Sequence, residues 1–276
     1  MKNYSIFLQE DFKKLKWTSS GSNQPIKVED TDSGIHLIVK DYNSDQEREA
    51  VEVVAAKIYE LMGAATTKPE IKKILLKRSD GTNEEIRGLV SEFQENLHPL
   101  TTEAALTLPL NKKVELAKHF IASVLVRNHD VVGMYFDNLM YNPETSHIVH
   151  VDAGGSFHFR AMGDIKGGNK TKTGDSKEDR HPFPREPEEL ESMVFSGKGA
   201  SKFFYPILKD LLLNETKQGS EALEVAGKKL KSIPDAKLRS LVIDGGLPEE
   251  FADRLISRKE KILERLPKLI SRIKES

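Results

Sequence analysis

Apolar and polar residues follow a β-strand pattern in the first part of the chain. Residues 26–29 alternate between apolar and polar, and residues 35–40 are rich in apolar and β-branched side chains. The Asp-Thr-Asp-Ser-Gly segment at 30–34 has turn chemistry, so the pattern predicts two strands joined by a turn. We expect all of residues 17–40 to be β structure. A turn of small polar residues at 19–23 would join the first two strands.

The period changes to that of an α-helix between Ser44 and Met62. One face of this segment is apolar, and its members are Ala50, Val53, Val54, Ile58 and Leu61. A stripe with this spacing predicts an amphipathic helix. Ser44 or Asp45 is the expected N-cap, and Gly63 fits the C-terminal stop.

Two more apolar runs, at 71–78 and 84–93, lie on either side of an Asp-Gly turn signal. An Asp-Gly pair between apolar runs predicts a β-hairpin. The first 95 residues are therefore expected to contain three strands, a helix and two further strands.

Helical patterns dominate after residue 96. An amphipathic helix is expected over 111–130, and short strands at 138–141 and 148–151 follow it. Residues 161–187 are rich in Gly, Lys, Thr, Asp and Pro, which predicts a loop. The rest reads as helical and ends in a long helix that Pro267 would kink. The predicted fold class is α+β, with a β-rich N-terminal lobe (1–95) and a mostly helical C-terminal lobe (96–276).

Composition narrows the classes of partner. The formal net charge is −1 over 276 residues, so we expect no nucleic-acid partner. No apolar run is long enough for a membrane span, and there is no cysteine. These features fit a cytoplasmic protein, including one exported into a host cell by a signal that the sequence does not reveal.

Residues suited to phosphate and metal chemistry stand at the ends of the expected elements. Backbone N–H groups of a small-residue turn can approach phosphate oxygens, a lysine neutralises phosphate charge, and carboxylate and amide oxygens bind Mg²⁺. In chain order these residues are Ser20, Gly21, Ser22, Lys40, Glu49, Glu52, Asp130, Asp137, Asn138 and Asp152. Such a set suits phosphoryl transfer, where positioning and electrostatics carry most of the catalysis.

These motifs, in this order, resemble the protein-kinase-like superfamily. The likeness is greatest to its atypical members: HipA-type toxin kinases, phosphoinositide kinases, CotH-type kinases and bacterial effector kinases. "IHLIVK" resembles the strand whose lysine binds phosphates, which implies that role for Lys40. "EREAVEVVAAKIYELMG" resembles the helix with the paired glutamate, where we prefer Glu52 to Glu49. "LVSEF" resembles the strand that leads into the adenine-binding hinge, which implies a nucleotide contact for Glu92.

The resemblance continues through the segment that would carry the chemistry. "NHDVVGMYFDNLMY" resembles the catalytic loop, which implies that Asp130 is the base and that Asn138 binds metal. "IVHVDAGGS" resembles the metal-binding strand end and assigns the second metal role to Asp152. Seven residues separate Asp130 from Asn138, whereas the family usually has four, so Asp137 is a rival catalytic residue. Ala153 also replaces the usual phenylalanine.

The resemblance implies an ATP- and Mg²⁺-dependent (or Mn²⁺-dependent) phosphotransferase of an atypical bacterial effector type. The expected acceptor is a Ser or Thr of a protein. A phosphoinositide or small-molecule hydroxyl is an alternative acceptor, and AMP transfer or a non-catalytic pseudokinase module are alternative functions. Residues 161–187 would then be an activation-type loop. Its lysines, Lys166 among them, would be solvated or would meet an acidic substrate.

Overall fold

The computed structural model describes residues 11–15, 25–43, 45–77, 81–133, 137–145, 147–160, 165–166, 181–196 and 204–275. It divides into two compact units. The first comprises Met1–Glu49 and Thr67–Glu95, and the second comprises Ala50–Thr66 and Asn96–Ser276. Among the described residues, strands make up most of the first unit and helices most of the second, so the predicted α+β class is confirmed.

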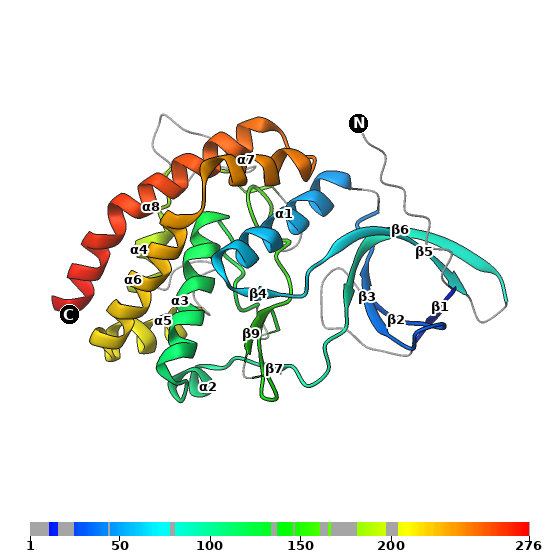
Figure 1. The fold of residues 1–276 in the computed structure, drawn as a ribbon, viewed down its shortest axis with the longest axis horizontal. Coiled ribbons are helices and arrows are strands. Elements are labelled where there is room, and N and C mark those ends of the chain that lie inside the picture. The colour runs from blue at the N-terminus through cyan, green and yellow to red at the C-terminus, as the bar shows by residue number, and fades with distance from the viewer. Residues whose placement is uncertain are drawn as a thin grey trace. The chain divides into compact units, whose positions relative to one another are not determined.

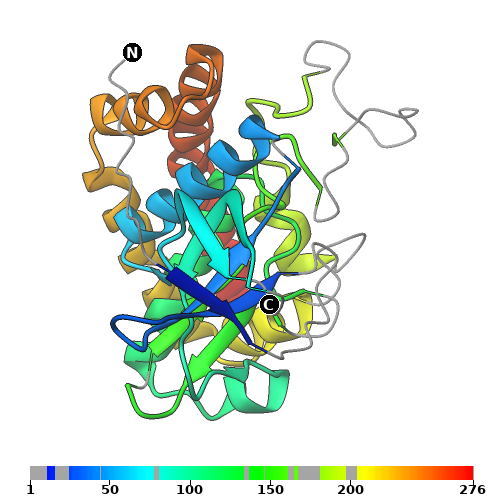
Figure 2. The same ribbon diagram turned by 90° about the vertical axis from the view of Figure 1, so that its right-hand side faces the viewer.

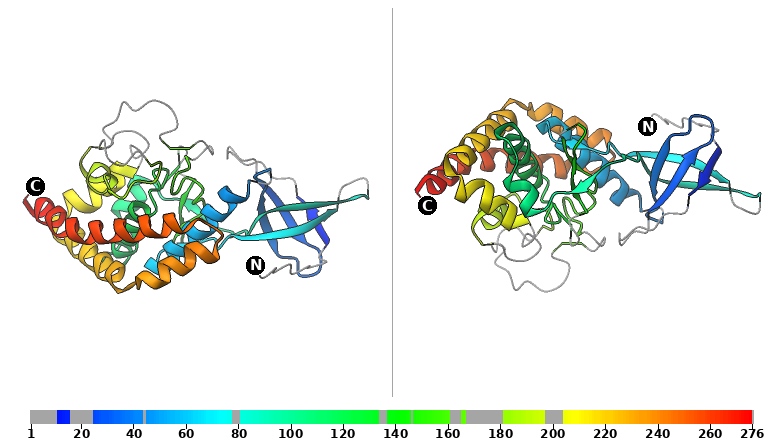
Figure 3. Two further views of the ribbon diagram at one scale, coloured as in Figure 1. Left: turned by 90° about the horizontal axis from the view of Figure 1, so that it is seen from above. Right: turned by 90° about the horizontal axis from the view of Figure 1, so that it is seen from below.

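The first unit is a closed five-stranded barrel (Figures 1 and 3). Its strands are neighbours in the order β1 (Asp11–Lys14), β2 (Ile26–Asp30), β3 (His36–Lys40), β6 (Asn83–Glu92) and β5 (Glu70–Lys77). The expected hairpin is β5–β6, an antiparallel pair. The barrel closes because β1 pairs in parallel with β5, and closure removes the open edges that a flat sheet would expose.

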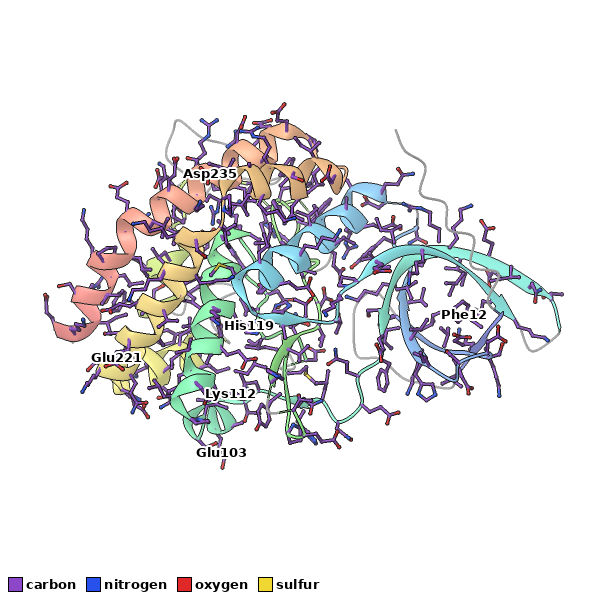
Figure 4. The ribbon with its side chains drawn as sticks, in the orientation of Figure 1. Phe12, Glu103, Lys112, His119, Glu221 and Asp235 are labelled. Atoms are coloured by element: carbon purple, nitrogen blue, oxygen red, sulfur yellow. The ribbon has the colours of Figure 1, made fainter. Side chains whose placement is uncertain are left out.

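The barrel has its own apolar core. Figure 4 shows Phe12 inside the ring of strands, where its side chain is buried. The other core members are Val28, Val39, Ile74, Leu76 and Val90. They alternate with outward polar residues because successive side chains of a strand point to opposite faces. The period-two pattern of the sequence therefore corresponds to the inside and outside of this barrel.

Helix α1 (Gln46–Met62) begins and ends where its sequence signals predict. The Oδ1 atom of Asp45 accepts the N–H of Arg48 at 3.1 Å, which is an N-cap bond. Gly63 has φ of +73°, and its N–H donates to Glu60 O at 2.8 Å while the next N–H donates to Tyr59 O at 2.9 Å. This pair of bonds is a Schellman motif, so the predicted stop is confirmed. The alternative N-cap, residue 44, lies outside the described residues.

The second unit contains a small sheet in the order β4 (Ala65–Thr66), β9 (His147–His150), β8 (Leu139–Asn142) and β7 (His98–Pro99). The strands β8 and β9 are the two that the sequence predicts, and they pair antiparallel (Figure 2). The two-residue strands at its edges were not foreseen, because such short segments carry no periodic signal.

Most of the second unit beyond this sheet is helical. The helices that follow α1 are α2 (Thr102–Leu106), α3 (Leu110–Leu125), α4 (Glu189–Phe195), α5 (Phe204–Lys209), the π-helical η2 (Asp210–Asn214), α6 (Thr216–Ser232), α7 (Asp235–Asp244) and α8 (Glu249–Glu275). Helix α6 packs against both α3 and α8 (Figure 3). Helix α8 continues without a break through Pro267. Within the described part of the chain, no helix is long and apolar enough to cross a membrane.

Candidate active site

The segment between α3 and β8 brings Asp130 and Asn138 together. The Nδ2 atom of Asn138 donates to the backbone carbonyl of Asp130 at 2.8 Å and to its carboxylate Oδ2 at 3.1 Å. The backbone N–H of Asn138 also donates to Val132 O at 3.2 Å. The segment between Asp130 and Asn138 therefore forms a loop whose two ends are hydrogen-bonded to each other. Residues 134–136 of this loop lie outside the described residues.

Asp152 lies at the end of the strand next to this loop. The N–H of Val151 donates to Asn138 O at 2.9 Å, which holds the loop against the end of β9. The Oδ1 atom of Asp152 accepts the N–H of Gly154 at 2.8 Å in a tight turn. The structure thus brings three of the predicted site residues, Asp130, Asn138 and Asp152, to one place.

The carboxylates in this group influence one another. Burial, followed by the negative charge of Asp152, raises the pKa of Asp130 to about 6. The hydrogen bond from Asn138 opposes that rise, and the charge of Asp137 adds to it. Buried carboxylates of like charge disfavour one another's ionised form, and they favour a cation in their midst.

The donor set fits Mg²⁺. No group of three or more His, Cys, Asp or Glu side chains suited to a metal occurs among the described residues. Mg²⁺ in nucleotide sites uses only one or two protein carboxylates, and phosphate oxygens and water complete its shell. The amide oxygen of Asn138 and the carboxylate of Asp152 are hard oxygen donors of this kind, so a metal would arrive together with the nucleotide.

Gly133 shapes the loop from inside, and it was not among the residues expected to form the site. Its φ is +74°, and a Cβ at this position would lie 2.2 Å from Asp137 Oδ1 and 3.1 Å from Asn138 Cγ. Only glycine tolerates both that backbone conformation and that contact. The Val-Val-Gly sequence directly after Asp130 was the available signal.

A second glycine, Gly88, allows the main chain to come close to Lys40 in the barrel. Lys40 ends β3 and pairs with Leu89 of β6. A Cβ on the neighbouring Gly88 would lie 2.4 Å from the carbonyl oxygen of Lys40. The glycine inside an otherwise apolar strand therefore allows the main chain at Lys40 to pass close to β6, as isolated strand glycines often do.

The two glutamates of α1 differ in their surroundings. Glu49 is fully buried, and its Oε2 accepts a hydrogen bond from Arg87 of β6. Burial raises the pKa of Glu49, and the charge of Arg87 opposes that rise. Glu52 is also buried, one turn further along the helix. The pairing of Lys40 with Glu52 stays a prediction.

Of the remaining residues that were predicted to contact the nucleotide, one lies in the barrel and three lie outside the described residues. Glu92 ends β6, where it pairs with Leu37. Ser20, Gly21 and Ser22 lie outside the described residues.

Lys166 corrects one expectation. It was expected among the solvated or substrate-facing lysines, but its side chain is buried. Its Nζ donates to the carbonyls of Gly155 (2.7 Å), Phe157 (3.1 Å) and Arg127. These three carbonyls replace water around the ammonium group, although burial still lowers its pKa. Lys166 therefore ties the turn after Asp152 to the end of α3.

A buried group of charges lies beside that lysine. Glu189 of α4 accepts hydrogen bonds from Arg258 of α8 (2.8 Å), from Arg127 (3.0 Å) and from His129 (3.0 Å). Burial opposes ionisation of Glu189, but Arg258, His129 and Arg127 outweigh it and hold its pKa well below the usual range. The residues on either side of Asn128 are thereby fixed to the helical core.

Comparisons with known proteins support the fold. No protein-family model matches the sequence, and no curated protein matches it. The structure does match the crystal structure of a Helicobacter pylori proinflammatory kinase, CtkA, with a TM-score of 0.54 and 14% sequence identity. The match covers 95% of this chain and 96% of that chain, and at this identity it concerns the fold alone. The chain therefore shares the α+β fold of that bacterial kinase.

Proposed function

We propose that this protein is an ATP- and Mg²⁺-dependent phosphotransferase that phosphorylates Ser or Thr residues of a protein. One observation carries the proposal. In a chain with a kinase-like fold, Asn138 is hydrogen-bonded to Asp130 next to the carboxylate of Asp152. This is the arrangement that a base and two metal-binding side chains require.

Each side chain of this group has a distinct role in the proposal. Asp130 accepts the proton of the acceptor hydroxyl. Because Asn138 donates through Nδ2, its amide oxygen is the atom that would bind the metal, together with the Asp152 carboxylate. When bound, Mg²⁺ neutralises charge on the phosphates.

Two features favour Asp130 over Asp137 as the base. Asn138 holds the Asp130 carboxylate directly, at 3.1 Å. The pKa of Asp130 is raised to about 6, closer to neutrality, where a general base is most effective. Asp137 instead packs over Gly133 and adds its charge to the group.

The nucleotide contacts of the proposal come from the first unit. Lys40 would neutralise charge on the ATP phosphates, with Glu52 as its partner, and the backbone around Ser20–Ser22 would approach the phosphates. Glu92, at the end of β6, would lie near the adenine. The close approach of Gly88 to the Lys40 carbonyl supports a fixed position for that lysine.

Transfer from ATP labelled at the α- or the γ-phosphate tests the proposal. Purified protein is incubated with Mg²⁺, with mixed acceptor proteins and separately with phosphoinositide vesicles. We expect γ-label alone to appear in protein, and Asp152→Ala to reduce it at least ~100-fold, as expected for loss of a metal ligand. Ser220→Ala is the control, because it removes a buried hydroxyl of α6 far along the chain from these residues.

Each other result has a defined meaning. Label from the α-phosphate would establish AMP transfer, and label in lipid would establish a phosphoinositide acceptor. Equal transfer by Asp152→Ala and the parent protein would refute the metal role. Nucleotide binding without turnover across all acceptors and with both Mg²⁺ and Mn²⁺ would support the pseudokinase alternative.

A further inference from the structure

We propose that Asn128 is a positioning residue that sets the orientation of Asp130 through a buried polar network. The network comprises the side chains of Tyr59, Ser123, Asn128 and His150, here named the Asn128 network. All four belong to the second unit and are at most 1% exposed. The inference rests on the proposed function, because it concerns the residue proposed there as the base.

The end of α3 directs Asn128 into the core. The N–H of Arg127 donates to Val124 O at 3.2 Å, and the N–H of Asn128 donates to Ser123 O at 2.8 Å. These bonds form a Schellman motif with Arg127, at φ of +56°, in the place that glycine usually takes. A non-glycine residue in this conformation is strained and persists only where its surroundings hold it. Here Glu189 holds the Arg127 side chain at 3.0 Å.

The Asn128 side chain uses both ends of its amide. Its Oδ1 accepts the backbone N–H of Asp130 at 3.0 Å, and this contact fixes the orientation of the amide, because an N–H can donate only to the oxygen. Its Nδ2 lies 3.2 Å from the Tyr59 hydroxyl and 3.3 Å from His150 Nε2. Both hydrogens of Nδ2 therefore have an acceptor, and His150 accepts through Nε2.

The network continues from Tyr59 into α3. The Ser123 hydroxyl donates to the carbonyl of His119 at 2.7 Å, so it accepts from the Tyr59 hydroxyl, also at 2.7 Å. The Tyr59 ring stacks on His150, with 4.6 Å between centroids and 28° between planes. His119 is labelled on α3 in Figure 4. A directed series of bonds thus runs from Asn128 through α1 to the backbone of α3.

This arrangement connects the elements that carry the proposed chemistry. His150 lies on β9, two residues before Asp152, and Tyr59 lies on α1, two turns after Glu52. The polar groups of Tyr59, Ser123 and Asn128 are all hydrogen-bonded, and paired buried groups of this kind make their surroundings rigid. Asn128 contacts the backbone of Asp130 and not the reacting atoms, so its effect on transfer would be exerted through position.

Tyr59→Phe is the cleanest variant, because it removes one acceptor of Asn128 and keeps the ring that stacks on His150. We expect kcat for γ-phosphate transfer to fall about tenfold with little change in KM for ATP, since small displacements of a base lower the rate of chemistry. Asn128→Ala should lower kcat further. The matched control is Ser220→Ala, whose Oγ is buried and has no hydrogen-bond partner within the described part of the chain. It should stay within about twofold of the parent.

Amide hydrogen exchange of Asp130, followed by NMR, provides a readout that does not need activity. We expect slow exchange in the parent protein and in Ser220→Ala, and at least about tenfold faster exchange in Tyr59→Phe, because the acceptor of that N–H is no longer held. A folded Tyr59→Phe variant with unchanged kcat or unchanged exchange would overturn the inference. If the parent protein transfers no phosphate, the proposed function fails, and the exchange rates alone decide whether Asn128 positions the loop.

Discussion

Asn138 donates one hydrogen bond to the Asp130 carboxylate at 3.1 Å and a second to the Asp130 carbonyl at 2.8 Å. The Asp130 side chain is partly buried, and burial and the charge of Asp152 raise its pKa to about 6. The hydrogen bond therefore holds a carboxylate whose ionised form the surroundings disfavour. Such a group suits a base, and its ionisation lowers the stability of the folded protein.

Asp130→Asn should make the metal-free protein more stable at pH 7.5. The pKa of Asp130 in the folded state lies above its ordinary value of 3.8, so the folded state binds more protons between these values. Stability consequently falls as pH rises from about 4 to about 6, and the full penalty of about 1–3 kcal/mol is present above that range. Urea unfolding should show a gain that is smaller at pH 5 than at pH 7.5. A destabilised variant at pH 7.5 would contradict this assignment.

Gly133→Ala should abolish most transfer activity, because the new methyl group would lie 2.2 Å from Asp137 Oδ1 and would displace the loop. We expect a loss of at least about tenfold in kcat/KM and about 1–2 kcal/mol in stability. Gly246→Ala is the control. Its φ of +84° carries similar backbone strain, but a Cβ there meets nothing within 4 Å. Similar activity losses in both variants would show that strain alone is responsible.

Gly88→Ala should weaken nucleotide binding about tenfold, since it would push the main chain of Lys40 away from β6. Calorimetric titration with an ATP analogue and Mg²⁺ measures this change. A double variant that combines Gly88→Ala with Lys40→Ala shows whether Gly88→Ala weakens binding through Lys40 or by disturbing the barrel as a whole. If Gly88 acts through Lys40, the double variant binds no more weakly than Lys40→Ala alone. An additive loss would contradict that route.

Glu189→Gln should destabilise the protein by about 3–5 kcal/mol, because it leaves the buried guanidinium of Arg258 without its counter-charge. Since the pKa of Glu189 is held below its usual value, this contribution is present above pH ~4.5 and is lost as pH falls further. Urea unfolding at pH 7.5 measures it. Glu249→Gln, which breaks an exposed pair with Arg239, should leave the midpoint nearly unchanged.

Local patterns predicted most of the fold. Strands β2 and β3, the β5–β6 hairpin and the limits of α1 carry their signals in adjacent residues: alternation, an Asp-Gly turn, a capping Asp45 and a stop at Gly63. Strand β1 (Asp11–Lys14) lies before the β segment that was predicted at 17–40. Closure of the barrel was not predictable in this way. It depends on the parallel pairing of β1 with β5, which are about 60 residues apart in sequence.

The residue types of the site could be predicted from the sequence, but the buried side chains that hold the site in place could not. The order of Asp130, Asn138 and Asp152 indicated a common location, and the structure brings them together. The burial of Lys166 depends on carbonyls from two distant segments. Asn128 likewise acts through partners on α1 and β9, so its sequence neighbours gave no sign of the network.

A crystal structure with Mn²⁺ and a non-hydrolysable ATP analogue would show which side chains bind the metal, because anomalous scattering locates the metal without any knowledge of the acceptor. We expect a Mn²⁺ peak bound by Asn138 and Asp152, with the Asp130 carboxylate facing the γ-phosphate. A metal and nucleotide bound elsewhere, or Asp137 in place of Asp130 at the γ-phosphate, would contradict this expectation.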